Sequence, residues 1–170
     1  MFNILSRMIR TGILTEPLPA VAEGPPAVDA LQRSLWKVLG RAVCIRHVDA
    51  GSRNGCELEI QALNNPYYNL EGAGIKFVAS PRHADLLLVT GPLSVNMEEA
   101  LRRTYDAMPD PKLVVALGDC AGCGGIFGRS YATRGSVANV IPVNHSIGGC
   151  PPGPAAILGG ILQALSSARS

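Results

Sequence analysis

Cysteine is the residue type whose placement in this sequence points most directly to chemistry. Cys56, Cys120 and Cys150 each stand in a turn that is rich in glycine or proline. Cys56 precedes a helical pattern of apolar residues, so its thiolate would lie at a helix N-terminus, where backbone N–H groups and the helix dipole favour negative charge. Three thiols at three separate turns are typical of a metal or cluster site that the fold assembles from distant parts of the chain.

The elements that must position these thiols are strands that alternate with helices. We expect strands at 42–48, 75–79, 86–90, 112–117 and 137–143, and helices at 31–39, 57–64, 96–108 and 154–167. The apolar run at 86–90 is continuous, which is typical of a strand buried on both faces of a parallel sheet. The pattern therefore predicts an α/β domain with a mostly parallel sheet flanked by helices.

Each of the three cysteine turns follows a predicted strand. In open α/β sheets, binding sites gather beyond the carboxyl ends of the strands. We therefore expect Cys56, Cys120 and Cys150 to converge at one edge of the sheet, although they are distant in sequence. This expectation follows from topology and from no local motif.

The group that such thiols would hold is left open by the residues alone. Glycine-rich turns suit an iron–sulfur cluster, because exposed backbone N–H groups can point at the sulfur atoms, and a [4Fe–4S] cluster normally takes four cysteines. A zinc site usually shows paired CxxC motifs, whereas this chain has a single one, Cys120 to Cys123. A thioredoxin-like dithiol would open a helix after a strand, and Gly124 and Gly125 argue against it. Buried structural thiols are a further alternative, chiefly for Cys44.

Length, composition and charge exclude several classes of protein. The chain has 170 residues, of which 47% are hydrophobic and 16% charged, so it is long enough for one globular core. A net charge of +2 is too small to argue for a nucleic-acid partner, and none is expected. Five cysteines are an odd number without a disulfide framework, which favours a reducing, intracellular setting.

The first 30 residues differ in character from the rest of the chain. Residues 1–14 place Arg7 and Arg10 among apolar side chains at helical spacing, and residues 15–30 are rich in Pro, Ala and Gly. We expect an amphipathic docking arm with a linker at 1–30, followed by a single domain at 31–170; a helix that lies on a membrane surface is the alternative for the arm. No apolar run is long enough for a transmembrane helix, and the N-terminus lacks the pattern of a signal peptide.

Four separated stretches carry a resemblance to a known family: GSRNGCELEI, NNPYYNLEGAGIKFVASPRHADLLLVTGP, PKLVVALGDCAGCGGIF and VIPVNHSIGGCPPGPAAILGGI. In this order they resemble the small, cluster-bearing subunit of energy-converting, membrane-bound [NiFe] hydrogenases, including the formate hydrogenlyase type. They are also similar to the homologous B subunit of respiratory complex I. The resemblance covers residues 35–165. It implies a flavodoxin-like α/β fold and a [4Fe–4S] cluster next to the catalytic site of a large subunit.

By this resemblance, Cys56, Cys120 and Cys150 match ligands of the cluster. The chain departs from the family at Arg53, where the hydrogenase-type motif has a further cysteine; a guanidinium is not an ordinary iron ligand. Three outcomes are open. Cys123 supplies the fourth thiolate; a water or another side chain completes the cluster, or the cluster has three irons; or the site has lost its cluster.

Other residues near these motifs are candidates for contact with the cofactor. A fixed charge at Arg53 would raise the potential of a nearby cluster, unless the side chain faces a partner carboxylate. Arg82 and His83 belong to a loop that lies near the cluster and the large subunit in the family, where His83 could relay protons; the alternative is a packing turn. Asp119 is either a group that supports the cluster or a turn acceptor.

The resemblance implies a non-catalytic electron-transfer subunit of an oxidoreductase complex. Its expected partners are a large hydrogenase-like or complex I-like subunit, a ferredoxin-like iron–sulfur subunit and the membrane subunits of the complex. The expected location is peripheral, on the cytoplasmic side of the inner (cell) membrane. The alternative, which Arg53 supports, is a structural subunit of a complex I-related assembly with no cluster or an altered one. A stand-alone flavoprotein is disfavoured, because the first loop lacks a Ser/Thr-rich phosphate-binding turn.

Overall fold

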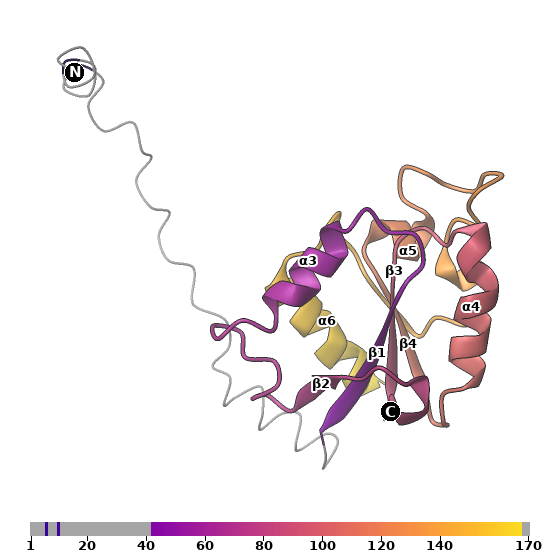
Figure 1. Cartoon of the computed structure of the whole chain (residues 1–170), viewed down its shortest axis with the longest axis horizontal. Helices are drawn as coiled ribbons and strands as arrows, with labels where there is room; N and C mark the ends of the chain where they lie inside the picture. The colour runs from indigo at the N-terminus through magenta and orange to yellow at the C-terminus, as the bar shows by residue number, and fades with distance from the viewer. Residues whose placement is uncertain (1–5, 7–9, 11–41, 168–170) are drawn as a thin grey trace.

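A computed structural model of the chain describes residues 6, 10 and 42–167. The predicted helix at 31–39, the boundary at residue 31 and nearly all of the predicted arm at 1–30 lie outside these residues. Figure 1 shows that the described chain forms one central sheet with helices packed on both of its faces. None of the helices within the described ranges is both long and apolar enough to cross a membrane.

The sheet has five parallel strands in the order β2-β1-β3-β4-β5. Their bounds are β1 (Val43–Asp49), β2 (Ile75–Phe77), β3 (Leu86–Thr90), β4 (Leu113–Leu117) and β5 (His145–Ile147). This is the flavodoxin-like order of a doubly wound sheet, in which the chain reverses direction across the sheet between β1 and β3. The predicted α/β fold class is confirmed.

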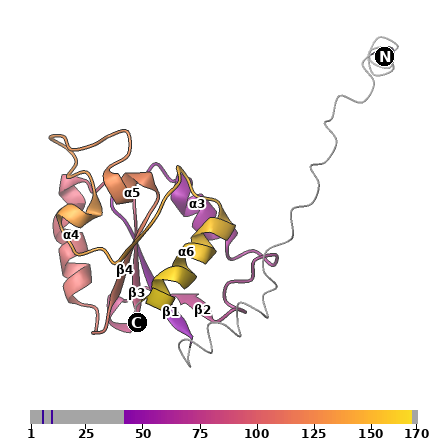
Figure 2. The same ribbon diagram turned by 180° about the vertical axis from the view of Figure 1, so that it is seen from behind.

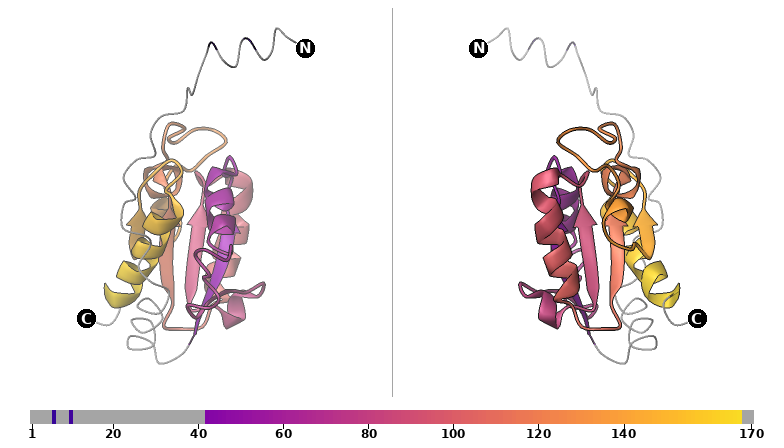
Figure 3. Two further views of the ribbon diagram at one scale, coloured as in Figure 1. Left: turned by 90° about the vertical axis from the view of Figure 1, so that its left-hand side faces the viewer. Right: turned by 90° about the vertical axis from the view of Figure 1, so that its right-hand side faces the viewer.

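Helices cover the two faces of this sheet. On one face lie α3 (Gly55–Ala62) and α6 (Pro154–Ser167), and on the other lie α4 (Val95–Asp106), the short α5 (Asp119–Cys123) and the 3₁₀ turn η2 (Val137–Asn139). Figure 2 shows the same layers from behind, and Figure 3 looks onto each covered face in turn. A second 3₁₀ turn, η1 (Pro81–His83), precedes β3.

The central strand β3 explains why the sheet forms. All five of its residues are buried, because Leu86 and Leu88 pack toward α3 and α6 while Leu87 and Val89 pack toward α4. Burial of one such side chain contributes about 1.5–3 kcal/mol to folding. A strand that is covered on both faces reads as a continuous apolar run, so the sequence predicts β3 at its observed bounds.

The predicted strand at 137–143 is wrong. This segment forms η2, and the last strand is β5 (His145–Ile147). The hydroxyl of Ser136 accepts a hydrogen bond from the backbone N–H of Ala138 at 3.2 Å and starts the turn, while Pro142 has no N–H to donate to a strand ladder. β5 is short and lies at the edge of the sheet, so its polar residues give no strand pattern.

The CxxC segment also differs from its prediction. The sequence places Cys120 in a glycine-rich turn, whereas the structure forms helix α5 (Asp119–Cys123) there. Gly118 and Gly124 flank this helix with φ values of 85° and 89°, a region of backbone conformation that favours glycine. The glycines therefore bound a short helix, and the motif does open a helix after a strand.

Candidate functional site

A cavity of about 240 Å³ lies at the carboxyl ends of the strands. Its walls come from the loops that follow β1, β3, β4 and β5, and it is lined by Ser52, Arg53, Gly55, Cys56, Gly91, Asp119, Cys120, Gly149, Cys150 and Pro151. Three of the five cysteines therefore meet at one cavity. The position is the crevice beyond the carboxyl ends of the strands where doubly wound sheets bind ligands.

Cys56 is positioned by the turn between β1 and α3. The carboxylate of Asp49 accepts hydrogen bonds from the backbone N–H groups of Gly51 and Ser52 at 2.8 and 2.6 Å. Asn54 then adopts a left-handed conformation with φ of 69°, and α3 begins at the next residue. These local bonds are the Asx type of turn, and they place the Cys56 thiol in the first turn of the helix.

Gly118 provides the space that the Cys56 thiol needs. A Cβ atom added at Gly118 would lie 2.9 Å from Cys56 Sγ and 3.3 Å from the carbonyl oxygen of Gly149. The absence of a side chain at residue 118 therefore leaves room for the end of β4 beside both other cysteine loops.

Asp119 joins the loop of Cys150 to the helix of Cys120. Its backbone N–H donates to the carbonyl of Gly149 at 2.9 Å, and its carboxylate accepts from the N–H of Gly149 at 2.8 Å. The pair of bonds holds Cys150 against the start of α5. The structure thus places Asp119 on the wall of the cavity, where its carboxylate joins two cysteine segments.

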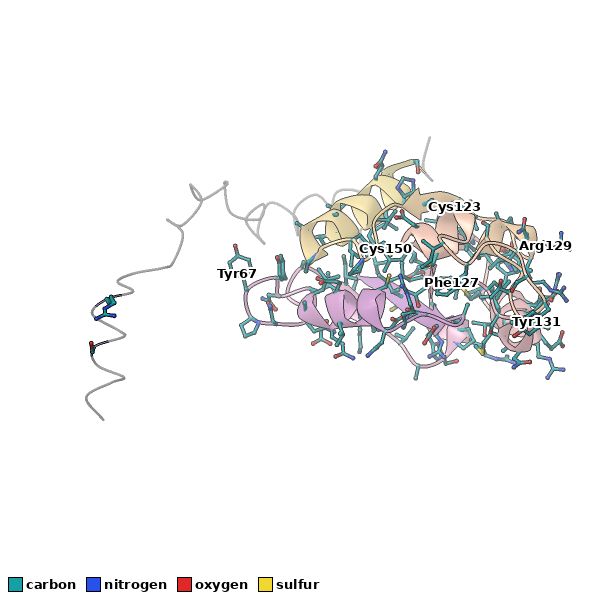
Figure 4. All side chains as sticks on the ribbon, turned by 90° about the horizontal axis from the view of Figure 1, so that it is seen from above. Tyr67, Cys123, Phe127, Arg129, Tyr131 and Cys150 are labelled. Atoms are coloured by element: carbon teal, nitrogen blue, oxygen red, sulfur yellow. The ribbon has the colours of Figure 1, made fainter. Side chains whose placement is uncertain are left out.

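Arg53 also lies on the cavity wall, three residues before Cys56. Its Nη2 donates to Cys150 Sγ at 3.2 Å, and its guanidinium carbon lies 5.3 Å from the centroid of the Phe127 ring. Figure 4 looks onto this end of the sheet and shows Cys150 and Phe127. The sequence does not single out Phe127, since one aromatic residue in a glycine-rich loop gives no signal.

Cys123 does not line this cavity. It is the last residue of α5, its side chain is exposed, and its thiol donates to the carbonyl of Asp119 at 3.1 Å. Its position outside the cavity is not apparent from the CxxC spacing, which puts Cys120 and Cys123 on neighbouring turns of the same helix.

The electrostatics of the three thiols favour a positively charged ligand. Burial raises the pKa of Cys56 to about 11, with Glu57, Cys120 and Cys150 raising it further and Arg53 opposing them. Burial likewise raises the pKa of Cys120, and Cys150 adds to that shift. Three thiolates this close repel one another, so they would ionise together only around a cationic group such as a metal or a cluster.

Cysteine thiols are the donors that iron–sulfur clusters take. Among the described residues, no group of three His, Cys, Asp or Glu side chains is arranged to hold one metal ion. A cluster makes a weaker demand on spacing, because each thiolate binds a different iron atom. Three thiols around a cavity of this volume therefore fit a polynuclear iron–sulfur group.

The structure does not bring Arg82 and His83 to the cavity. Both are exposed in η1, which precedes β3 and so lies at the opposite end of the sheet. In the same turn, the N–H of Ala84 donates to the carbonyl of Pro81 at 3.1 Å, and the carboxylate of Asp85 accepts from the N–H of Cys44 at 2.9 Å. The geometry here is that of a packing turn.

A chain of polar side chains beside the cavity is not predicted from the sequence. The Glu57 carboxylate accepts hydrogen bonds from Ser52 Oγ, at 2.6 Å, and from Thr90 Oγ1. Thr90 is fully buried and also bonds His47 Nε2 at 3.0 Å, and burial lowers the pKa of His47. The residue in the sequence that could have indicated this polar chain is Thr90, a polar residue at the end of an apolar strand.

Several known proteins are similar to this chain in sequence, and a solved structure is similar in fold as well. A probable membrane-bound hydrogenase subunit of Pyrococcus furiosus is 46% identical over 77% of this chain and 78% of its own length. Formate hydrogenlyase subunit 7 of Escherichia coli is 39% identical over 97% of this chain, which spans 63% of that protein. A chain of the membrane-bound sulfane sulfur reductase, an archaeal respiratory membrane complex, superposes with a TM-score of 0.65 at 34% identity, covering 74% of this chain and 70% of that one.

The family match includes every residue that lines the cavity except Ser52 and Arg53. Residues 54–164 match the family described as NADH ubiquinone oxidoreductase, 20 Kd subunit, and this range contains Cys56, Cys120 and Cys150. The match begins one residue after Arg53, the position at which the chain departs from the hydrogenase-type motif. With the fold, the position of the cavity and the relatives in agreement, the chain belongs to the family of the 20 kDa subunit of NADH–ubiquinone oxidoreductase.

Proposed function

We propose that this chain is a non-catalytic electron-transfer subunit of a membrane-associated, hydrogenase-like or complex I-like oxidoreductase. In this proposal, Cys56, Cys120 and Cys150 hold a [4Fe–4S] cluster in the cavity. The observation that carries the proposal is the convergence of three thiols from three separate loops on one cavity. Such a cluster would supply the transfer of single electrons, which no side chain of the cavity can carry out by itself.

The chain's own residues would hold the cluster and shape its surroundings. The three cysteines would bind it as thiolates, and Asp119 would keep the loop of Cys150 in place through its bond to Gly149. Arg53 would present a positive charge on the same wall. A positive charge beside a cluster favours its reduced, more negative state and so raises its potential.

The proposed partners are the large hydrogenase-like or complex I-like subunit, a ferredoxin-like iron–sulfur subunit and the membrane subunits of the complex. The relatives support this, since the proteins of Pyrococcus furiosus and the sulfane sulfur reductase are named as membrane-bound. Exposed apolar side chains follow the CxxC helix, with Ile126 81% and Phe127 44% exposed, and Phe127 lies against Arg53 of the cavity wall. Exposed apolar residues that gather near a site are typical of a protein interface. The proposed location is peripheral, on the cytoplasmic side of the membrane.

Iron and acid-labile sulfide counts on the purified complex test this function. The full chain is co-expressed anaerobically with its partner subunits, and the matched control is the same complex with Cys56, Cys120 and Cys150 all changed to alanine. We expect about four more iron atoms per complex in the natural form, with a matching EPR signal on reduction. Equal iron contents in the two complexes would contradict the proposal.

A second candidate function is that of a structural subunit without a cluster. The observation in its favour is Arg53, whose guanidinium lies on the cavity wall and bonds Cys150, a proposed ligand of the cluster. A structural role without a cluster predicts that the complex with the three alanines assembles in full and has the same iron content as the natural complex.

A further inference from the structure

Arg53 is held in the cavity by contacts on two sides. Its Nη2 donates to Cys150 Sγ at 3.2 Å, and the ring of Phe127 lies 5.3 Å from its guanidinium carbon. A guanidinium over an aromatic face is attracted by the ring, and a hydrogen bond from a charged donor is stronger than a neutral one. The side chain therefore has a defined place on the cavity wall, although it is exposed to solvent.

Arg53 shares the wall of the cavity with all three thiols. It bonds Cys150 directly, and Cys56 and Cys120 line the same cavity. Cys123 is not among the lining residues, and its thiol bonds the carbonyl of Asp119 within its own helix. The cavity wall therefore carries three thiols and one guanidinium.

Helix α5 is held in the orientation that keeps Cys123 out of the cavity. Ser136 Oγ donates to the carbonyl of Gly122 at 2.7 Å, and Ala121 is fully buried in the core. On another side, a Cβ atom added at Gly122 would lie 2.6 Å from Ser146 Oγ, so β5 approaches the helix closely. Rotation of α5 to point Cys123 inward would break the bond to Ser136 and expose Ala121.

We propose that Arg53, and not Cys123, completes the ring of side chains around the cavity. A cluster would then be held by Cys56, Cys120 and Cys150 alone, with the guanidinium at the corner where a fourth thiolate would stand. Arg53 has no lone pair to offer an iron atom, so it acts there as a fixed charge and a hydrogen-bond donor. This inference rests on the proposed function and concerns the same cavity.

The arrangement has a chemical consequence that can be measured without any activity assay. The iron atom at the Arg53 corner would have no thiolate from this chain, so mild oxidation with ferricyanide in the presence of a chelator should remove it selectively. We expect iron in the natural complex to fall from about four to about three atoms per cluster, with the EPR signal of an oxidised three-iron cluster. A cluster with four thiolates resists the same treatment.

Three variants in the co-expressed complex make the test specific. Cys123→Ser should leave the iron content and the oxidation behaviour unchanged, because the Cys123 thiol is outside the cavity. Arg53→Cys should supply the missing thiolate and keep about four irons after oxidation. Arg53→Met, which removes the charge and adds no thiol, should still lose an iron atom on oxidation and should lower the reduction potential of the cluster.

The outcomes separate this inference from the proposed function. Loss of iron in Cys123→Ser before any oxidation would overturn the inference while leaving the cluster itself established. Resistance of the natural complex to oxidation, equal to that of Arg53→Cys, would overturn it as well. A natural complex with no more iron than the form with three alanines would contradict the proposed function, and the inference with it.

Discussion

The two ends of the parallel sheet carry different sets of polar groups. At the amino end, Asp85 accepts from the N–H of Cys44 at 2.9 Å, and Asn144 accepts from the N–H of Val114 at 2.8 Å. Such bonds within the chain satisfy the polar groups of the fold. The carboxyl end has bonds of this kind as well, but it also gathers three thiols and the guanidinium of Arg53 around a cavity. The contrast indicates that the polar groups at the amino end stabilise the fold, whereas the carboxyl end also carries groups that can hold a ligand.

The backbone at the carboxyl end is shaped by loops that lie very close to one another. At the carboxyl end, a Cβ atom added at Gly91 would lie 2.3 Å from the backbone nitrogen of Ser52, so the loops after β1 and β3 pass in direct contact. Gly91 has φ of 80°, which few other residues adopt. Such close approach of the loops forms the cavity wall, and it is stabilised by the apolar core beneath it.

The largest effect on stability is expected in the middle of the sheet. Leu88→Ala removes a fully buried side chain of β3 and should lower the free energy of unfolding of the full chain by about 2–5 kcal/mol. Denaturant titration followed by circular dichroism measures this. Iron per folded molecule should not change, since Leu88 does not line the cavity; a selective loss of iron would mean that the core and the site are not separate.

The next effect is expected at the amino end. Asp85→Ala leaves the N–H of Cys44 without its acceptor and should cost about 1–3 kcal/mol. The same denaturant titration reports it, with Asp106→Ala as the control, because Asp106 is an exposed residue at the end of α4. Equal stabilities of the two variants would contradict the division between the ends.

At the carboxyl end, substitution of Asp119 should change both the free energy of unfolding and the iron content of the complex. Asp119→Ala removes the acceptor of the Gly149 N–H, with an expected cost of about 1 kcal/mol and a lower iron content in the complex. Asp119→Asn keeps an acceptor oxygen and should retain most of the iron. If both variants retain iron equally, the bond to Gly149 does not position Cys150.

His47 should give the chain a stability that depends on pH. Burial lowers its pKa in the folded state below the usual 6.5, with Glu57 and Asp49 opposing and Arg46 assisting the shift. As the pH falls through 6.5, the unfolded chain therefore takes up a proton before the folded chain does, and the free energy of unfolding decreases. Titrations between about pH 7.5 and 5.5 should show a smaller slope in His47→Gln; identical slopes would assign the effect to other groups.

The smallest effect on stability is expected at the thiols themselves. Cys150 is exposed, so Cys150→Ser should change the free energy of unfolding of the metal-free full chain by no more than about 0.5 kcal/mol. The same variant should lose most of the iron of the complex, because serine replaces a proposed thiolate ligand. A large destabilisation without metal would give Cys150 a structural role.

The sequence predicts the parts of the fold whose residues carry their own signal. The bounds of β3 and of α6 (Pro154–Ser167) agree with the predictions, because one is a continuous apolar run and the other begins at a proline with a periodic apolar face. The last strand differs from its predicted position. β5 pairs with β4 at the edge of the sheet, and its own residues show no alternation of polar and apolar side chains. Edge strands are specified by their neighbours more than by their own pattern.

By itself, the sequence determines that this is a parallel α/β domain with cysteines in the turns after its strands. Only the tertiary structure decides which side chains meet. The spacing alone lets either the Cys123 or the Arg53 side chain lie at the cavity, since each residue is three positions from a thiol of the cavity. Ser136 bonds α5 from a later segment and so keeps Cys123 outside the cavity. Phe127 and Cys150 hold Arg53 on the cavity wall. These contacts join residues far apart along the chain, and no local pattern encodes them.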